Sequence, residues 1–197
     1  MKRLLGKLLV LASLLAAVPF AQADDIRLGV PGYGGTGCPA GSASVTLSPD
    51  NKELSIIFDK YVAQAGASVG RTLDRKTCNI AIPVHVPQGL SVSVFKVDYR
   101  GFAATRGGEA DFNVEYFFAG SRGPVFTKTF TNEERDFLLT NNLAMESIIW
   151  SRCGEDVNVR VNSSSKARSF SGQDTMISVD SADVSAGLIY HLQWRRC

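Results

Sequence analysis

The sequence has few of the residues on which most catalytic and metal sites depend. Of its 197 residues only two are histidines, His85 and His191, and its four cysteines form no Cys-x-x-Cys pair. No Gly-x-Ser-x-Gly elbow occurs, and no Gly-rich segment leads into the Lys of a P-loop. The formal net charge is only +2, which excludes a strongly basic nucleic-acid binder. With 45% hydrophobic and 20% charged residues, the composition is that of a globular domain.

Long apolar runs are also missing, except at the start of the chain. Lys2, Arg3 and Lys7 precede the apolar residues 8–20, and small residues then stand at the −3 and −1 positions of a cleavage site that ends at Ala23. This order is typical of a secretory signal peptide of bacterial type over residues 1–23, cleaved after Ala23. A retained N-terminal anchor is the alternative. Because the run is short for a bilayer span, we expect no stable membrane insertion of the mature chain.

Cleavage there changes both length and charge. It leaves 174 residues, and because the removed segment has three basic residues and no acidic one, the net charge falls from +2 to −1. A nearly neutral chain argues against binding to nucleic acid or anionic lipid. No linker or internal repeat divides the remainder, so residues 24–197 are expected to form one domain, secreted or periplasmic.

The four cysteines have a different meaning in an oxidising compartment. An even number favours disulfides over metal binding, and four cysteines allow three pairings. We favour Cys38–Cys78 and Cys153–Cys197, because each closes a local loop, of 40 and 44 residues. Each loop is worth roughly 3–4 kcal/mol in the chain-entropy model.

Alternation of apolar and polar residues dominates the rest of the chain. Residues 80–86, 112–118, 157–161 and 188–194 each place apolar side chains at every second position. Nine or ten short strands of this kind predict an all-β fold, an antiparallel two-sheet β-sandwich that is Ig-like or jelly-roll-like. Apolar parity shifts near Phe95, which predicts a bulge.

Four segments interrupt this pattern. Residues 32–39 are Gly-rich and predict an N-terminal loop pinned by the disulfide at Cys38. Residues 131–134 fit a capping box and predict one short helical turn. Residues 143–150 fit either helix or strand, of which we favour strand, and the glycosylation sequon at 162–164 is interpreted as a polar loop.

Ionisable residues give no convincing catalytic group. His85 and His191 both fall on the polar faces of their strands. Glu155 and Asp156 are expected to point to opposite faces, and Glu133 stands beside a second glutamate in the residues of the capping box. Substitution of His85, His191, Glu133 and Asp180 would test for a hydrolase.

No cofactor and no metal is expected. A calcium ion bound at Asp180 and Asp183 is the alternative to ordinary capping of a turn by these side chains.

Aromatic residues offer the best candidates for a binding surface. Tyr116 and Phe117 lie in a run of three consecutive rings, so at least one ring must face away from the others. Tyr116, Phe117 and Trp194 are the candidate binding residues, with core packing as the alternative.

Five short motifs occur in order with the four cysteines. They are residues 35–42 (GTGCPAGS), 75–78 (RKTC), 97–101 (VDYRG), 150–154 (WSRCG) and 192–197 (LQWRRC). Together they resemble the small secreted four-cysteine proteins of domain of unknown function family 4360. The resemblance implies secretion, a compact disulfide-bonded domain and no established activity, and it offers no catalytic residue to transfer.

The sequence thus favours a secreted or envelope-associated, non-catalytic binding module whose ligand is a polysaccharide or another protein. An inhibitor or effector of another protein is the first alternative, and an extracellular hydrolase is the second.

Overall fold

The computed structural model describes residues 27–49, 53–142, 150–179 and 188–197. The expected cleavage site after Ala23, the turn from Asp180 to Asp183 and residues 143–149 lie outside these ranges. Within the described residues the regular structure is β apart from one 3-10 turn, η1 (Ala67–Val69). The predicted all-β fold is therefore confirmed.

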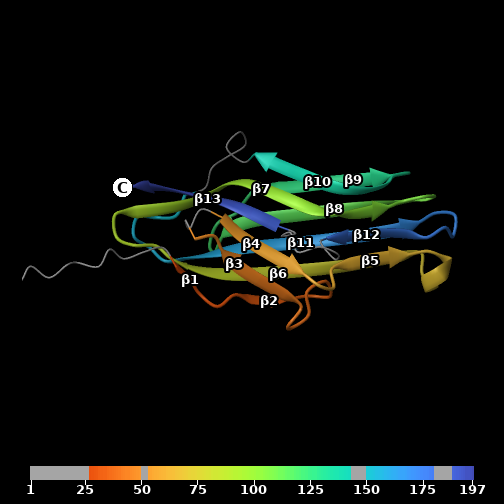
Figure 1. Ribbon diagram of the computed structural model, residues 1–197, viewed down its shortest axis with the longest axis horizontal. Coiled ribbons are helices and arrows are strands. Elements are labelled where there is room, and N and C mark those ends of the chain that lie inside the picture. The colour runs from red at the N-terminus through yellow and green to blue at the C-terminus, as the bar shows by residue number, and fades with distance from the viewer. Residues whose placement is uncertain (1–26, 50–52, 143–149, 180–187) are drawn as a thin grey trace, which may run out of the picture.

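Two antiparallel sheets form the two layers of a β-sandwich (Figure 1). The six-stranded sheet has the order β1-β6-β11-β8-β9, with β2 also paired to β6. Its strands are β1 (Arg27–Leu28), β2 (Gly32–Gly34), β6 (Leu73–His85), β8 (Gly108–Phe118), β9 (Val125–Thr131) and β11 (Val157–Ser169).

The seven-stranded sheet has the order β3-β4-β13-β7-β12-β5, with β10 paired to the other side of β7. Its strands are β3 (Ala43–Leu47), β4 (Glu53–Phe58), β5 (Val62–Ala65), β7 (Leu90–Ala104), β10 (Glu134–Asn142), β12 (Thr175–Val179) and β13 (Leu188–Arg196). Three strands are longer than the short strands that the alternation predicts: β6, β7 and β11 have 13, 15 and 13 residues.

The core lies between the sheets and follows the predicted alternation. On β6 the side chains of Ile80, Ile82 and Val84 are buried, while their neighbours are at least partly exposed. On β8 the buried set runs from Ala110 to Phe118 at every second residue. Aromatic side chains fill the space between the two sheets. For example, Tyr99 packs edge-on against Phe112, with ring centres 5.1 Å apart.

The expected bulge in β7 is confirmed. Lys96 lies opposite His191 of β13 and Val94 lies opposite Leu192, so Phe95 is the extra residue on its strand. An extra residue reverses which face the following side chains occupy, and this accounts for the parity shift in the sequence.

The predicted helical turn at residues 131–134 is wrong. This segment is a corner where the chain leaves β9 in one sheet and enters β10 in the other. Thr105 holds the corner: its backbone N–H donates to the Glu133 carbonyl at 2.7 Å, and its hydroxyl accepts the Glu133 N–H at 2.9 Å. Asn132 takes a positive φ of 53°, which turns the chain between sheets.

The polar-loop interpretation of residues 162–164 is also wrong, because they lie in the middle of β11. Ser163 and Ser165 point inward and are buried. The Tyr61 hydroxyl donates to the Ser163 hydroxyl at 3.0 Å, and burial raises the pKa of Tyr61 to about 12 despite such hydrogen bonds. Small hydroxyl side chains thus make room for a tyrosine from the opposite layer.

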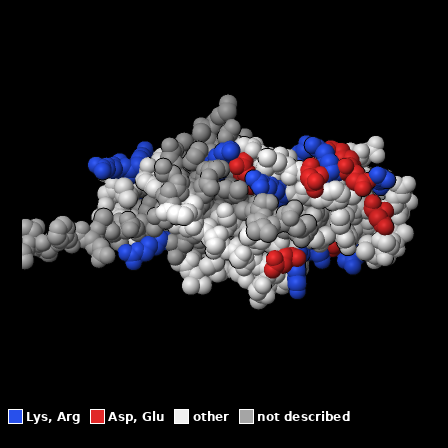
Figure 2. All heavy atoms as spheres, viewed as in Figure 1, with Lys and Arg blue, Asp and Glu red and all other residues white. Residues whose placement is uncertain are grey.

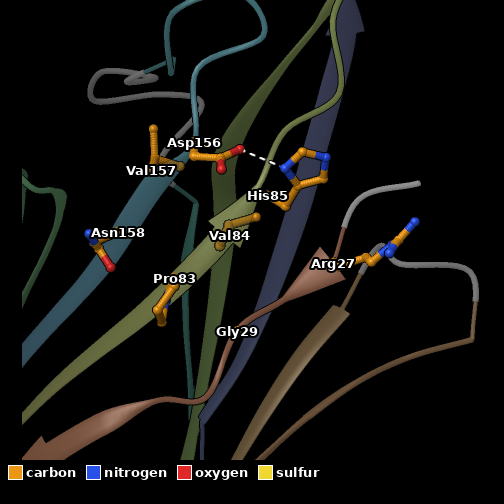
Figure 3. A pocket seen from close by; sticks show the side chains of 8 residues that line it. All are labelled: Arg27, Gly29, Pro83, Val84, His85, Asp156, Val157 and Asn158. Atoms are coloured by element: carbon orange, nitrogen blue, oxygen red, sulfur yellow. Dashed lines mark hydrogen bonds and ion pairs between the residues drawn. The ribbon is translucent and has the colours of Figure 1, made fainter. Parts of the chain in front are cut away.

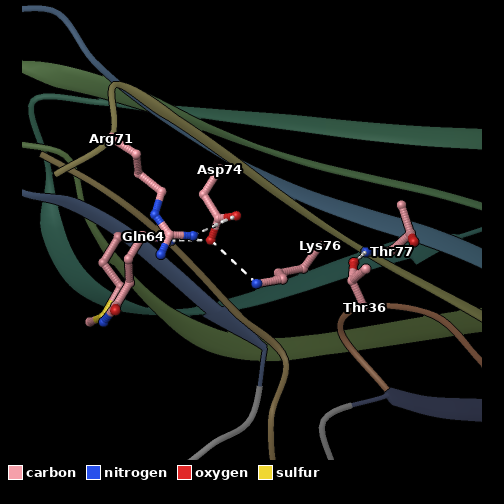
Figure 4. A network of polar contacts seen from close by, with 7 residues as sticks. Thr36, Gln64, Arg71, Asp74, Lys76 and Thr77 are labelled. Atoms are coloured by element: carbon pink, nitrogen blue, oxygen red, sulfur yellow. Dashed lines mark hydrogen bonds and ion pairs between the residues drawn. The ribbon is translucent and has the colours of Figure 1, made fainter. Parts of the chain in front are cut away.

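Two disulfides join Cys38 to Cys78 and Cys153 to Cys197, the pairs that the sequence favours. The Gly-rich loop is held along β6 near the first of them: Gly37 N–H donates to the Thr77 carbonyl, and Thr77 N–H donates to the Thr36 hydroxyl (Figure 4). A Cβ at Gly37 would lie 2.4 Å from the Tyr61 ring, so only glycine fits there.

Charged side chains of both signs gather toward one end of the face that Figure 2 shows. At the corner after β9, Glu133 pairs with Arg135 and Glu134 with Arg106. No helix in the described part of the chain is long and apolar enough to cross a membrane.

Candidate binding surface

The outer face of the six-stranded sheet carries a group of polar side chains around one aromatic ring. The register places Asn162 of β11 opposite Asn79 of β6 and Glu115 of β8. The next outward position of β11, Arg160, lies opposite Phe117 of β8. Since neighbouring strands are about 4.8 Å apart, these five residues form one continuous surface. We call Asn79, Glu115, Phe117, Arg160 and Asn162 the outer patch.

The polar side chains of the outer patch make no hydrogen bond and no ion pair with any residue that the structure describes. Their neighbours on the same face differ. Asn113 donates to the Thr127 hydroxyl at 2.7 Å, and Arg75 contacts the Ser164 hydroxyl at 3.4 Å. The patch is therefore a place where hydrogen-bonding groups remain open to a ligand on a rigid sheet.

Ion pairs border the patch toward the charged end of the molecule. Arg168 pairs with Glu109 at 3.3 Å, and Lys166 pairs with Asp111. Partial burial opposes ionisation of Asp111, but the hydrogen bonds from Lys166 and Thr129 and the charge of Arg168 lower its pKa overall. These four charged side chains pair with one another, unlike the polar side chains of the outer patch.

Only one of the three predicted binding residues faces outward. Phe117 is half-buried on the outer face, but Tyr116 points into the core with 3% of its surface exposed. Trp194 packs, partly buried, against the core from the other sheet. The expectation that Tyr116 belongs to a binding surface is thus wrong: adjacent strand residues face opposite sides, and the inner side of β8 is core.

A cleft of about 260 Å³ opens where β6 ends and β11 begins (Figure 3). Its polar lining includes His85, Asp156 and Asn158, with the Pro83 ring among the apolar lining. His85 Nδ1 lies 2.8 Å from Asp156 Oδ1, and Val86 N–H donates to the same oxygen at 3.0 Å. The His85 Nδ1–H donates this hydrogen bond and the carboxylate accepts it, which orients both side chains.

The hydrolase candidates do not come together. Glu133 pairs with Arg135 at the corner after β9. His85 is the last residue of β6, at the opposite end of the six-stranded sheet. His191 belongs to β13 in the other sheet, and Asp180 lies outside the described residues. Within the described ranges, no three His, Cys, Asp or Glu side chains are placed to hold a metal ion.

Sequence reasoning missed most of the outer patch because residues 162–164 were interpreted as a loop. The signal was present: the alternation from Val157 to Val161 continues with serine and alanine at the inward positions. Extending the strand through these small residues would have placed Asn162 on the outer face. Its neighbours Asn79 and Glu115 required the strand register.

The whole expected mature chain, residues 24–197, matches a family described as domain of unknown function, DUF4360. The chain belongs to this family. The resemblance seen in the cysteine motifs is confirmed. A relative from Arthroderma benhamiae named "Uncharacterized secreted protein" is 35% identical, and the match covers 88% of this chain and 73% of the relative.

A solved structure of TmCBM61 in complex with beta-1,4-galactotriose is similar at a TM-score of 0.35 and 9% identity, over 84% of this DUF4360 chain and 88% of that one. A similarity of this size transfers no ligand and no residue role to the present chain.

Proposed function

We propose that this DUF4360 protein is an exported, non-catalytic binding protein for a polysaccharide, and that the outer patch contacts the ligand. The observation that carries the proposal is that four polar side chains without partners among the described residues lie in register around Phe117. Neighbouring side chains on the same face pair with one another, whereas these four meet solvent and can exchange water for a ligand.

The chemistry of the patch suits a sugar. Asn79 and Asn162 each offer an amide that donates and accepts, Glu115 offers two acceptor oxygens, and Arg160 offers a planar fork of donors. Sugar hydroxyls need both donors and acceptors at close spacing. Phe117 supplies an apolar ring against which the C–H face of a pyranose can pack.

Export is part of the same proposal. Residues 1–23 act as a signal peptide removed after Ala23, and residues 24–197 form the exported domain, secreted or periplasmic. Three observations support this: the family match begins at residue 24, the two disulfides fit an oxidising compartment, and a relative carries the name of a secreted protein.

Co-sedimentation of the oxidised protein, residues 24–197, with peptidoglycan, chitin and cellulose tests the function. We expect saturable binding to at least one polymer, and at least a ten-fold loss of affinity in Phe117→Ala and in Asn162→Ala. Phe170→Ala is the matched control, since Phe170 is a 64% exposed ring beyond the far end of β11. Binding to no polymer, or equal binding by all variants, would refute the proposal and favour a protein partner.

A further inference from the structure

The outward side chains of β11 continue the outer patch toward the cleft. Asn158, Arg160 and Asn162 occupy alternate positions of the strand, and Asp156 comes immediately before it. Alternate residues of a strand are about 6.7 Å apart, so Asp156 and Asn162 are separated by about 20 Å. None of the side chains of Asn158, Arg160 and Asn162 has a hydrogen-bond or ion-pair partner among the described residues.

The cleft adds a fixed acceptor at the end of this row. Both donors to Asp156, from His85 and from the Val86 backbone, use Oδ1. Oδ2 accepts no hydrogen bond from a described residue, and the Asp156 side chain is 68% exposed. The carboxylate is thus oriented by the protein while one oxygen remains available to a ligand. Asn158, exposed and lining the same cleft, adds an amide two residues along.

The charges along the row favour an uncharged ligand. Asp156 and Glu115 each bring a negative charge near the two ends. Arg160 between them and Arg27, which lines the cleft with Asp156, each bring a positive charge, so the four charges balance. A polyanion would meet a carboxylate at both ends, whereas a neutral chain rich in hydroxyl groups meets alternating acceptors and donors.

We propose that β11 is the track for an extended, uncharged glycan chain of about four sugar units, with one end in the Asp156–Asn158 cleft and the other at Asn162 and Glu115. Phe117 and Arg160 contact the middle of this chain. The inference rests on the proposed function and adds to it the length, direction and charge of the ligand. A straight row at even spacing suits an extended β-1,4-linked chain, which keeps its sugars in line.

Calorimetric titration with cello- and chito-oligosaccharides of two to six units tests the track. We expect affinity to rise with length up to about four units and then to level off. Asp156→Ala should weaken hexamer binding about ten-fold, as expected for the loss of a hydrogen bond to a charged group, and Asn158→Ala about five-fold, as for a neutral one. Both variants should leave dimer binding unchanged. Glu155→Ala is the matched control, because Glu155 pairs with Arg152 instead. Equal thermal unfolding of the variants shows that each is folded.

Three results would contradict the proposal, and they are distinguishable. If dimer and hexamer bind equally while Phe117→Ala abolishes binding, the ligand occupies the outer patch alone and the proposed function stands. If no oligosaccharide and no polymer binds, both proposals fail. Tighter binding of an oligogalacturonate than of a neutral chain of equal length would contradict the assignment of an uncharged ligand.

Discussion

Replacing Cys38 and Cys78 together by alanine is expected to cost more stability than replacing Cys153 and Cys197, although the two disulfides close loops of almost the same length. The sequence separations are 40 and 44 residues. In the chain-entropy model each bridge is therefore worth about 4 kcal/mol, and the model alone predicts no difference.

The surroundings of the two bridges supply the difference. Cys38 and Cys78 have no exposed surface and belong to the core, whereas Cys153 and Cys197 are exposed. Removing two core sulfurs leaves space that costs about 1 kcal/mol for each. The double variant Cys38→Ala/Cys78→Ala should thus lose about 6 kcal/mol, and Cys153→Ala/Cys197→Ala about 4 kcal/mol at most.

Urea unfolding of the oxidised proteins, followed by tryptophan fluorescence and circular dichroism, measures both losses. Under a low concentration of dithiothreitol, peptide mapping of alkylated thiols should also find Cys153 and Cys197 labelled before Cys38 and Cys78. Equal losses of stability, or earlier labelling of Cys38 and Cys78, would refute this reasoning. Either result would mean that the buried Cys38–Cys78 bridge contributes no more than the exposed Cys153–Cys197 bridge.

Three further predictions concern the interior. The stabilising contribution of neutral Tyr61 is full below pH 10 and is lost between pH 10 and about 12, because only the unfolded chain ionises this residue there. Over this range wild-type stability should therefore fall by about 2–3 kcal/mol more than that of Tyr61→Phe. Phe112→Ala should lose about 3–5 kcal/mol in urea unfolding, because Phe112 is fully buried against Tyr99. Gly37→Ala should lose about 1–3 kcal/mol, because its Cβ would meet the Tyr61 ring at 2.4 Å.

Each of these has a result that would contradict it. Parallel pH profiles for wild type and Tyr61→Phe would mean that the hydroxyl is reached by water in the folded state. A loss under about 1 kcal/mol in Phe112→Ala would mean that the core closes around the missing ring. An unchanged midpoint in Gly37→Ala would mean that the loop shifts away from Tyr61 without cost.

The fold class could be predicted from the sequence because apolar and polar residues alternate along most of the strands. Alternation at residues 80–86 and 112–118 assigns side chains to two faces, and a change of parity at Phe95 reveals the bulge. The prediction from local pattern failed at residues 131–134, where the Glu133 backbone pairs with Thr105, just past the end of β7, instead of starting a helix. It also failed at residues 162–164, where small serines occupy inward positions usually held by larger apolar residues.

Most of the candidate site could not be predicted from the sequence, because the site depends on which strands are neighbours. Alternation places Phe117 and Asn162 on outer faces, but it does not reveal that β8, β11 and β6 are neighbours. The predicted group of Tyr116, Phe117 and Trp194 rests on aromatic residue type and on the run of rings at 116–118, and the alternation of β8 separates its first two members.

By itself the sequence determined properties that depend on composition or on neighbours along the chain: the family, the all-β class, the faces of most strands and the two local cysteine pairs. The tertiary structure decided what depends on strand order and register. Only cross-strand pairing brings Asn79, Asn162 and Glu115 into one row, and only the approach of β6 to the start of β11 joins His85 to Asp156. Register depends on the packing of two whole sheets, so no single segment contains that information.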